Sequence, residues 1–200
     1  MTSNERMDAP DETWSRRALL SGAGKTALSA TAVALLVGCE SIAQSDEAAD
    51  PAADVAILNT ALGLEHEAIG AYQLGAESGL LRPEVLPVAV LFQSHHKQHA
   101  EALANAVTKF GGAPTAPQTL ARYAEKLKAD TLKSQTDVLS LAATLEKQAA
   151  DIYLSVIPSF NDRSLAQAAG RLAADETMHW TALAAALGRD LPQDALTFGA

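Results

Sequence analysis

The sequence predicts an all-α fold, a four-helix bundle with one long crossover between the second and third helices. Alanine is abundant, and aromatic residues make up only 4% of the 200 residues, which favours packed helices over sheets. Between residues 54 and 188 the apolar residues recur every three or four positions, the period of an amphipathic helix. Glycine and proline fall mainly between these apolar stripes. A chain of this length suits one domain of ordinary size.

A targeting segment is expected to occupy residues 1–39. The stretch Ser15-Arg16-Arg17-Ala18-Leu19-Leu20 precedes a mildly apolar run from Ala27 to Val37. An arginine pair before such a run resembles a twin-arginine export signal. A membrane-spanning helix would need about 20 consecutive apolar residues, and this run is shorter. We therefore expect the twin-arginine export machinery as a partner and the periplasm or cell envelope as the location.

The only cysteine closes this segment. Leu36-Val37-Gly38-Cys39 resembles a bacterial lipobox, which implies a lipid anchor through Cys39; the alternative is cleavage further on, after Ala43. A single cysteine excludes a disulfide within the chain. Residues 40–53 are acidic and small, as in a flexible tether. The bundle is then expected over residues 54–188, followed by a C-terminal tail over 189–200.

The first helix pair is predicted from two apolar stripes. One stripe ends near Gly79 and consists of Leu58, Leu62, Glu65, Ala68, Ile69 and Tyr72. The next helix is expected to start at Arg82-Pro83-Glu84, because proline suits a first turn, and to stop at Gly111-Gly112. Its stripe consists of Val85, Ala89, Phe92, His96, His99, Leu103, Val107 and Phe110.

A longer connection separates this pair from the second. Residues 113–134 are proline-rich, contain a short helical piece around 120–127, and are long enough to cross the end of a bundle. The third helix is expected to close at Pro158, with the stripe Leu139, Ala142, Glu146, Ala149, Tyr153 and Val156. The fourth is expected to close at Gly188, with the stripe Leu165, Ala169, Leu172, Glu176, His179, Leu183 and Leu187.

The two helix pairs look like copies of one another. Glu65-x-x-Ala68-x-x-x-Tyr72 recurs as Glu146-x-x-Ala149-x-x-x-Tyr153, and His99-x-x-Ala102-Leu103 recurs as His179-x-x-Ala182-Leu183. An internal repeat of this kind predicts two equivalent pairs that meet about a pseudo-twofold axis.

Polar residues interrupt every apolar stripe near its middle, and burial of such residues is costly unless they are paired or bind metal. They are Glu65, His96, His99, Glu146, Glu176 and His179. Because residues three apart share a helix face, Glu176 and His179 point together into the bundle. His95 could replace His96 as the inward histidine, although the stripe favours His96. Tyr72 and Tyr153 are expected to pack and to bond to ligands on neighbouring helices, while His66, Glu67 and Glu101 are expected to be solvated.

This pattern resembles the ferritin-like superfamily of di-metal carboxylate proteins, with Glu-x-x-Ala-x-x-x-Tyr steps similar to those of rubrerythrins, over residues 54–188. The resemblance implies that Glu65 and His99 serve one metal, that Glu146 and His179 serve the other, and that Glu176 bridges them. The family expects a second bridging glutamate where this chain has His96. Three carboxylates leave about one positive charge uncompensated on two divalent ions, and a histidine cannot bridge two metals. Iron is the first choice, with manganese or zinc as alternatives.

Three functional hypotheses follow. The first is an oxidoreductase in which a reduced metal pair meets oxygen or peroxide. The second is a protein that binds metal without turnover, and the third is a degenerate bundle whose histidines and glutamates only pair with each other. The chain lacks rubredoxin-like cysteines, so electrons would come from an external donor. Lys plus Arg number 15 against 24 Asp plus Glu, which argues against nucleic acid as a partner. The sequence is compatible with an oligomer.

Overall fold

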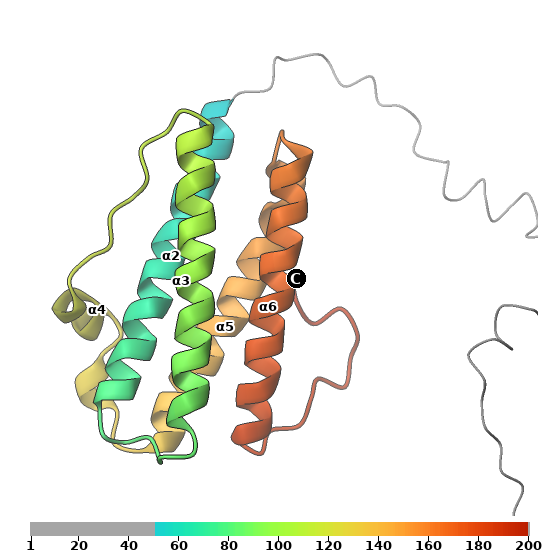
Figure 1. Cartoon of the computed structure of the whole chain (residues 1–200). Coiled ribbons are helices and arrows are strands. Elements are labelled where there is room, and N and C mark those ends of the chain that lie inside the picture. The colour runs from blue at the N-terminus through green and yellow to red at the C-terminus, as the bar shows by residue number, and fades with distance from the viewer. Residues whose placement is uncertain (1–50, 200) are drawn as a thin grey trace, which may run out of the picture. The chain divides into compact units, whose positions relative to one another are not determined.

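The computed structural model describes residues 51–199, which form a bundle of four long helices (Figure 1). The helices are α2 (Pro51–Glu77), α3 (Leu86–Lys109), α5 (Gln135–Val156) and α6 (Arg163–Ala186). No strand occurs among the described residues, and the prediction of an all-α bundle is confirmed. The predicted export signal, Cys39 and most of the predicted tether lie outside this part of the chain.

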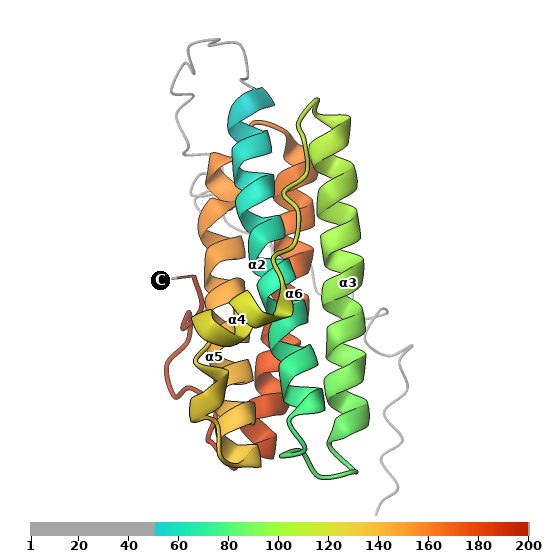
Figure 2. The same ribbon diagram turned by 90° about the vertical axis from the view of Figure 1, so that its left-hand side faces the viewer.

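The long helices form two antiparallel pairs, α2 with α3 and α5 with α6. Short connections join the helices within each pair, as predicted, and the second contains a 3-10 turn, η2 (Ile157–Ser159). The long connection contains α4 (Leu120–Lys126) and a second 3-10 turn, η1 (Ala129–Thr131). It was expected to cross the end of the bundle, but it runs along the side instead (Figure 2). The reason is that α3 ends at one end of the bundle and α5 begins at the other.

Specific contacts fasten the long connection to α2. The side chain of Asn59 donates a hydrogen bond to the carbonyl of Ala113 (3.0 Å) and accepts one from the amide of Thr115 (2.8 Å). Further along, the ring of Tyr123 packs against Gly70, where an added Cβ would lie 2.6 Å from the ring. Glycine at position 70 therefore lets the connection lie flat on the helix.

Two helix starts differ from the predicted ones. Helix α2 begins at Pro51, three residues inside the predicted tether, and α3 begins at Leu86 rather than near Arg82. A turn does form at Arg82, whose carbonyl accepts hydrogen bonds from Val85 and Leu86. The residue after Leu86 is Pro87, which has no amide N–H to continue the helical hydrogen bonds. The regular helix therefore starts after the predicted turn, with Pro87 in its own first turn.

Side-chain caps and one buried carboxylate fix the second helix pair. Ser134 caps α5 by accepting from the amide of Asp137, and Asp162 caps α6 by accepting from the amides of the residues that follow. Asp54, in the first turn of α2, is buried and accepts hydrogen bonds from the amides of Asn161 and Asp162. The helical stripes predict Asp54 only as the start of the bundle. Asp54 therefore ties α2 to the connection between α5 and α6.

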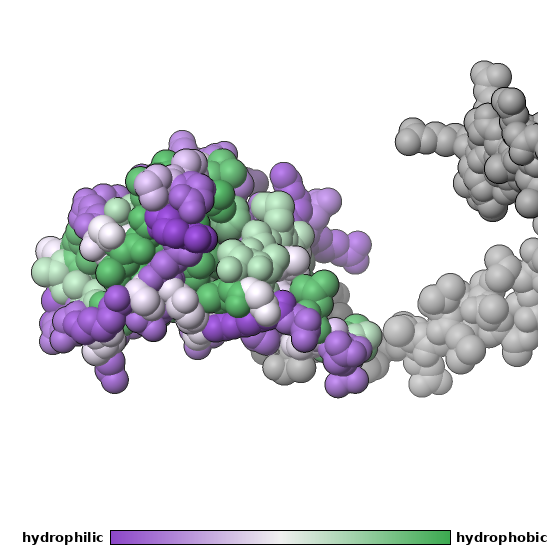
Figure 3. All heavy atoms as spheres, turned by 90° about the horizontal axis from the view of Figure 1, so that it is seen from below, coloured by the Kyte–Doolittle hydropathy of each residue, from purple (hydrophilic) through white to green (hydrophobic). Residues whose placement is uncertain are grey.

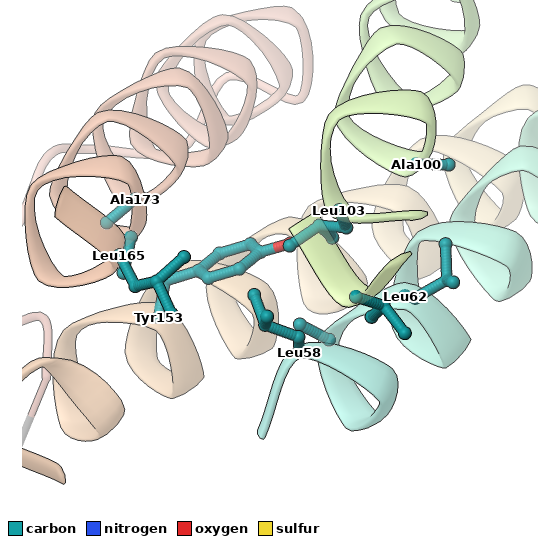
Figure 4. Close-up of a cluster of buried hydrophobic side chains, with 10 residues drawn as sticks. Leu58, Leu62, Ala100, Leu103, Tyr153, Leu165 and Ala173 are labelled. Atoms are coloured by element: carbon teal, nitrogen blue, oxygen red, sulfur yellow. The ribbon is translucent and has the colours of Figure 1, made fainter. Parts of the chain in front are cut away.

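Two apolar clusters fill the bundle, one towards each end. The cluster in Figure 4 surrounds Tyr153 with side chains from all four long helices. The other contains Tyr72, Phe92, Leu139 and Leu183. None of the helices within residues 51–199 is both long and apolar enough to cross a membrane. The layer between the two clusters holds the polar residues described next.

Candidate metal centre

The structure brings all six predicted site residues together in one buried layer. Each long helix contributes at least one of them: Glu65 from α2, His96 and His99 from α3, Glu146 from α5, and Glu176 and His179 from α6. The most exposed of the six retains only 7% of its accessible surface. The helical stripes in the sequence therefore located the layer correctly.

Glu176 lies between His99 and His179, the two histidines at equivalent positions of the repeat. Its Oε1 is 3.1 Å from Nδ1 of His99, and its Oε2 is 3.4 Å from Nδ1 of His179. Both carboxylate oxygens are buried without a hydrogen bond, and so is Nδ1 of His99. Buried polar atoms that lack partners are costly. A cation between these atoms would satisfy all of them.

His96 lies in the same layer and contacts two further carboxylates. Its Nδ1 lies 2.8 Å from Oε2 of Glu65, and its Nε2 lies 3.1 Å from Oε1 of Glu146. The alternative in which His95 points inward in its place does not occur, because His96 is the fully buried residue of the two. A single imidazole thus joins the two helix pairs where the family pattern has a carboxylate.

The donor atoms form two overlapping groups. One group consists of Glu65, His96, His99 and Glu176, and the other of His96, Glu146, Glu176 and His179. Within each group the candidate ligand atoms all lie within 4.8 Å of one another. His96 and Glu176 are shared. This grouping matches the division into halves that the family resemblance implied, with Glu176 between them.

The two repeated tyrosines connect the halves crosswise. Tyr72 of α2 donates a hydrogen bond to Oε1 of Glu146 on α5, and Tyr153 of α5 donates one to Oε1 of Glu65 on α2. Burial raises the pKa of both phenols well above 10, and the neighbouring carboxylates raise it further. Both therefore remain hydrogen-bond donors at neutral pH. The predicted role of the tyrosines is confirmed, and the crosswise pairing agrees with the predicted pseudo-twofold relation.

We expect Tyr72→Phe and Tyr153→Phe to lower the free energy of unfolding by similar amounts, about 1.5–3 kcal/mol each, because each leaves a buried carboxylate short of one donor. Tyr123→Phe is the matched control, since its hydroxyl accepts only from the backbone amide of Gln118. It should cost about 0.5–1.5 kcal/mol. Urea denaturation measures all three. Markedly unequal losses at Tyr72 and Tyr153 would contradict the symmetric assignment.

His99 and His179 each have a partner at Nε2, the ring nitrogen that points away from the centre. With Nδ1 turned inward, Nε2 of His99 faces Oδ2 of Asp175 at 3.3 Å, and Nε2 of His179 faces Nδ1 of His95 at 2.9 Å. Hydrogen bonds to the outer nitrogen fix the orientation and tautomer of a ligating imidazole. Sequence reasoning missed Asp175 and weighed His95 only as an inward residue. Both immediately precede a shared site residue, which is a signal that could have found them.

A comparison with protein families places the fold. A family model described as the ferritin-like domain matches residues 53–189. The chain belongs to the ferritin-like family. A crystal structure of a conserved hypothetical protein, rv2844, from Mycobacterium tuberculosis is similar to this chain, with a TM-score of 0.58, 20% sequence identity, and coverage of 72% of this chain and 97% of that one. At this identity the likeness shows the fold alone. A search of curated proteins finds no match.

Charge within this ferritin-like centre is mutually compensated. Burial by itself lowers the pKa of His96, but hydrogen bonds with Glu146 and Glu65 outweigh it and raise the pKa to about 10. Burial likewise lowers the pKa of His99, and Glu176 and Glu65 raise it to about 10. For Glu65 and Glu146, burial raises the pKa, yet the histidines bring it below the usual range.

Glu176 differs from the other two carboxylates. Burial raises its pKa, and the imidazoles of His179 and His99, which lie at ion-pair distance, do not offset the effect. The centre therefore holds one carboxylate that the protein alone solvates poorly. A divalent ion is the kind of group that would stabilise its charged form.

Three flanking residues were expected to be solvated. Glu101 is exposed, as expected, but His66 is half-buried and Glu67 is largely buried, its carboxylate paired with Nζ of Lys126. The prediction for Glu67 is wrong because α4, which carries Lys126, covers this face of α2. The path of the long connection could not be foreseen from the helical stripes.

A cleft between α2 and α5 leads to the centre. Its volume is about 470 Å³, and it reaches His96 and Glu146. Glu67, Lys126 and Asp151 also line it. Glu67 is paired with Lys126, and Asp151 with Lys147, so the charges along the cleft are balanced. The ferritin-like centre is therefore enclosed but has a polar route to the surface.

Proposed function

We propose that this chain is an exported ferritin-like protein that binds two divalent metal ions, iron as the first choice, within its bundle. One observation carries the proposal: the fully buried carboxylate of Glu176 has no hydrogen-bond partner on either oxygen and lies between two inward imidazole nitrogens. The buried Glu and His cluster is compatible with metal binding on a fold that belongs to the right family.

Each residue has a distinct part in this proposal. Glu65 and His99 would hold one ion, Glu146 and His179 would hold the other, and Glu176 would bridge the two. His96 would bind one of the two ions. Tyr72 and Tyr153 hold the outer carboxylate oxygens, and Asp175 and His95 orient the imidazoles. Bound iron would supply one-electron redox chemistry towards oxygen or peroxide. The surrounding apolar clusters limit access of water to the layer.

A non-catalytic metal-binding protein, or a structural helical lipoprotein, is the second candidate function. The observation that favours it is the contact of His96 with both Glu65 and Glu146. A protonated imidazole in this place pairs with two carboxylates without metal, and its single positive charge offsets one of their two negative charges. On this alternative the centre would hold fewer than two ions and would show no turnover.

The deciding experiment is elemental analysis of the full chain, as purified and after anaerobic reconstitution with Fe²⁺, alongside Glu146→Ala and the exposed control Glu125→Ala. About two ions per chain that fall in the Glu146 variant alone would support the proposal. No stoichiometric metal in any sample would overturn it. A ratio near one supports the second candidate. Consumption of peroxide by the reduced protein, compared with the Glu146 variant, then tests redox activity.

Export and anchoring are tested separately, because they rest on residues 1–39. Replacement of Arg16 and Arg17 by Lys should retain the chain in the cytoplasm when the cells are fractionated. Cys39→Ser should remove the mass of the lipid and release the chain from membranes into the soluble periplasmic fraction. If the Cys39 variant behaves like the natural chain in both assays, the anchor is ruled out and cleavage after Ala43 is favoured.

Metal loading should release protons. Because His96 and His99 have pKa values of about 10 without a bound ion, both carry a proton at pH 7, and each must lose it to bind metal. For His179, burial lowers the pKa, but Glu146 and Glu176 outweigh it, so this pKa is raised as well. We therefore expect at least about two protons per loaded centre and an apparent affinity that rises at least about 100-fold per pH unit near neutrality, since each proton contributes about tenfold. Zn²⁺ titration by calorimetry in buffers of different ionisation enthalpy measures the number. Release of no protons would contradict the assignment of these histidines.

A further inference from the structure

A second, apolar cavity lies at the end of the bundle where α2 ends and α3 begins. Its volume is about 260 Å³, and all four long helices and the long connection line it. Seen from this end, hydrophobic residues are exposed among hydrophilic ones (Figure 3). Neither the proposed metal chemistry nor the family assignment uses this cavity.

The lining restricts the ligand to uncharged chemistry. Among the described residues that line the cavity, only Glu84 and Tyr72 have polar side chains, and none is Lys, Arg or His. Tyr72 already donates its hydroxyl to Glu146. No cation among these described residues lines the cavity to receive a carboxylate or phosphate, and the charge of Glu84 is already paired with Arg82. Burial in such surroundings is favourable for hydrocarbon alone.

Volume and length restrict the ligand further. A protein cavity of about 150 Å³ accommodates benzene, so a cavity of about 260 Å³ suits roughly ten carbon atoms at the same density. Along α3 the lining extends from Val85 to Phe92, a rise of about 10 Å. A cavity of this volume and length is about as wide as one extended hydrocarbon chain.

The cavity has an apolar rim and an inner wall of aromatic rings. At the rim, Val88 is 44% exposed; Val90 and Leu91, two and three residues further along α3, are also exposed but do not line the cavity. At the inner wall, the ring of Phe92 stacks on His179 with 4.2 Å between the ring centroids. An apolar chain that enters at the rim would therefore end one aromatic ring away from the metal centre.

We propose that this cavity binds the end of one uncharged aliphatic chain of about ten carbons. The site consists of apolar side chains that are present whether or not metal is bound. It can therefore be tested on the chelator-treated full chain, and the result is independent of the proposed metal function.

The test is calorimetric titration with primary alcohols from hexan-1-ol to dodecan-1-ol. Each added methylene that enters the cavity should strengthen binding about fourfold, since its burial is worth about 0.8 kcal/mol, and the gain should cease near ten carbons. Decanoate should bind at least tenfold more weakly than decan-1-ol. Absence of saturable binding of decan-1-ol would overturn the proposal, and so would affinity that rises as steeply from decan-1-ol to dodecan-1-ol as it does below ten carbons, because neither behaviour fits a cavity of fixed size.

Two alanines on α6 give a matched pair of variants. Both Ala185 and Ala186 are exposed, but only Ala186 lines the cavity. Ala186→Phe should weaken decan-1-ol binding at least tenfold, and Ala185→Phe should change it less than twofold. Ala89→Leu, which fills the cavity from within, should abolish binding and leave the melting temperature equal or higher. Equal effects of the two phenylalanine substitutions would overturn the proposal.

A second copy of the chain could cover the same rim. Sedimentation velocity with and without Val90→Asp distinguishes this case, because Val90 is exposed but does not line the cavity. A monomer that binds decan-1-ol equally well with and without this substitution supports the proposal. A dimer that dissociates in the Val90 variant, together with an absence of alcohol binding, overturns it in favour of a contact between copies.

Discussion

Glu176→Gln should abolish metal binding in both halves of the centre. Glu176 is the only carboxylate that belongs to both groups of candidate ligands, so an amide in its place removes the one negative charge that both ions would share. We expect the apparent affinity for both ions to fall at least 1000-fold, about 4 kcal/mol. Elemental analysis should then give no stoichiometric metal. At free metal 100-fold above the wild-type dissociation constant, the variant should lose about 2.7 kcal/mol of metal-dependent stabilisation.

Folding of the variant provides its internal check. A neutral amide of the same shape removes a carboxylate whose pKa is raised by burial, but it also removes the ion-pair partner that lies 3.1 Å from Nδ1 of His99. We therefore expect the chelator-treated variant to fold, with a free energy of unfolding no higher than that of wild type. Glu101→Gln, at an exposed position on α3, is the control and should change neither metal content nor stability. Retention of two ions by the Glu176 variant would refute the bridging role.

The helical stripes were sufficient to predict the bundle and the contents of its polar layer. A stripe that places Leu58, Leu62 and Glu65 on one face implies burial of that glutamate, whichever helices it meets. The internal repeat indicated Tyr72 and Tyr153, which were expected to bond to ligands on neighbouring helices; that each reaches the opposite helix pair is seen only in the structure. Long periodic segments carry this information because burial of one face is determined locally.

Features that depend on the long connection could not be predicted in the same way. Glu67 lies off the apolar stripe and would be solvated in an isolated bundle, but Lys126 arrives from α4 to pair with it. The burial of Asp54 similarly depends on amides more than a hundred residues away. Such contacts are set by the path of the chain between helices, for which residues 113–134 carry no periodic signal.

A comparison of equivalent positions in α3 and α6 shows the asymmetry of the centre. Position 95 corresponds to 175 in the repeat, and position 96 to 176, so α3 has histidines at both places where α6 has Asp175 and Glu176. The half of the layer near α3 therefore lacks two carboxylates. His96 fills part of this deficit by pairing with Glu65 and Glu146.

His96→Glu should change metal affinity and metal-free stability in opposite directions. A glutamate at this position restores four carboxylates against two divalent ions, so we expect the affinity for the second ion to rise at least 100-fold, about 2.7 kcal/mol. Without metal, the variant buries a fourth carboxylate and removes the imidazole between Glu65 and Glu146. Breaking such a buried pair costs about 3–5 kcal/mol. Calorimetric metal titration and urea denaturation of the chelator-treated protein measure the two effects.

Two further variants separate charge from ligation. Gln98→Glu adds a carboxylate at an exposed position two residues along α3, and it should alter neither quantity if the effect of His96→Glu is local to the centre. His96→Ala removes the imidazole and adds no charge, so it should destabilise the metal-free protein without strengthening the second site. A rise in affinity in His96→Ala equal to that in His96→Glu would mean that the wild-type imidazolium merely repels the second ion. Unchanged affinity in His96→Glu would show that the missing carboxylate is not what distinguishes the two halves.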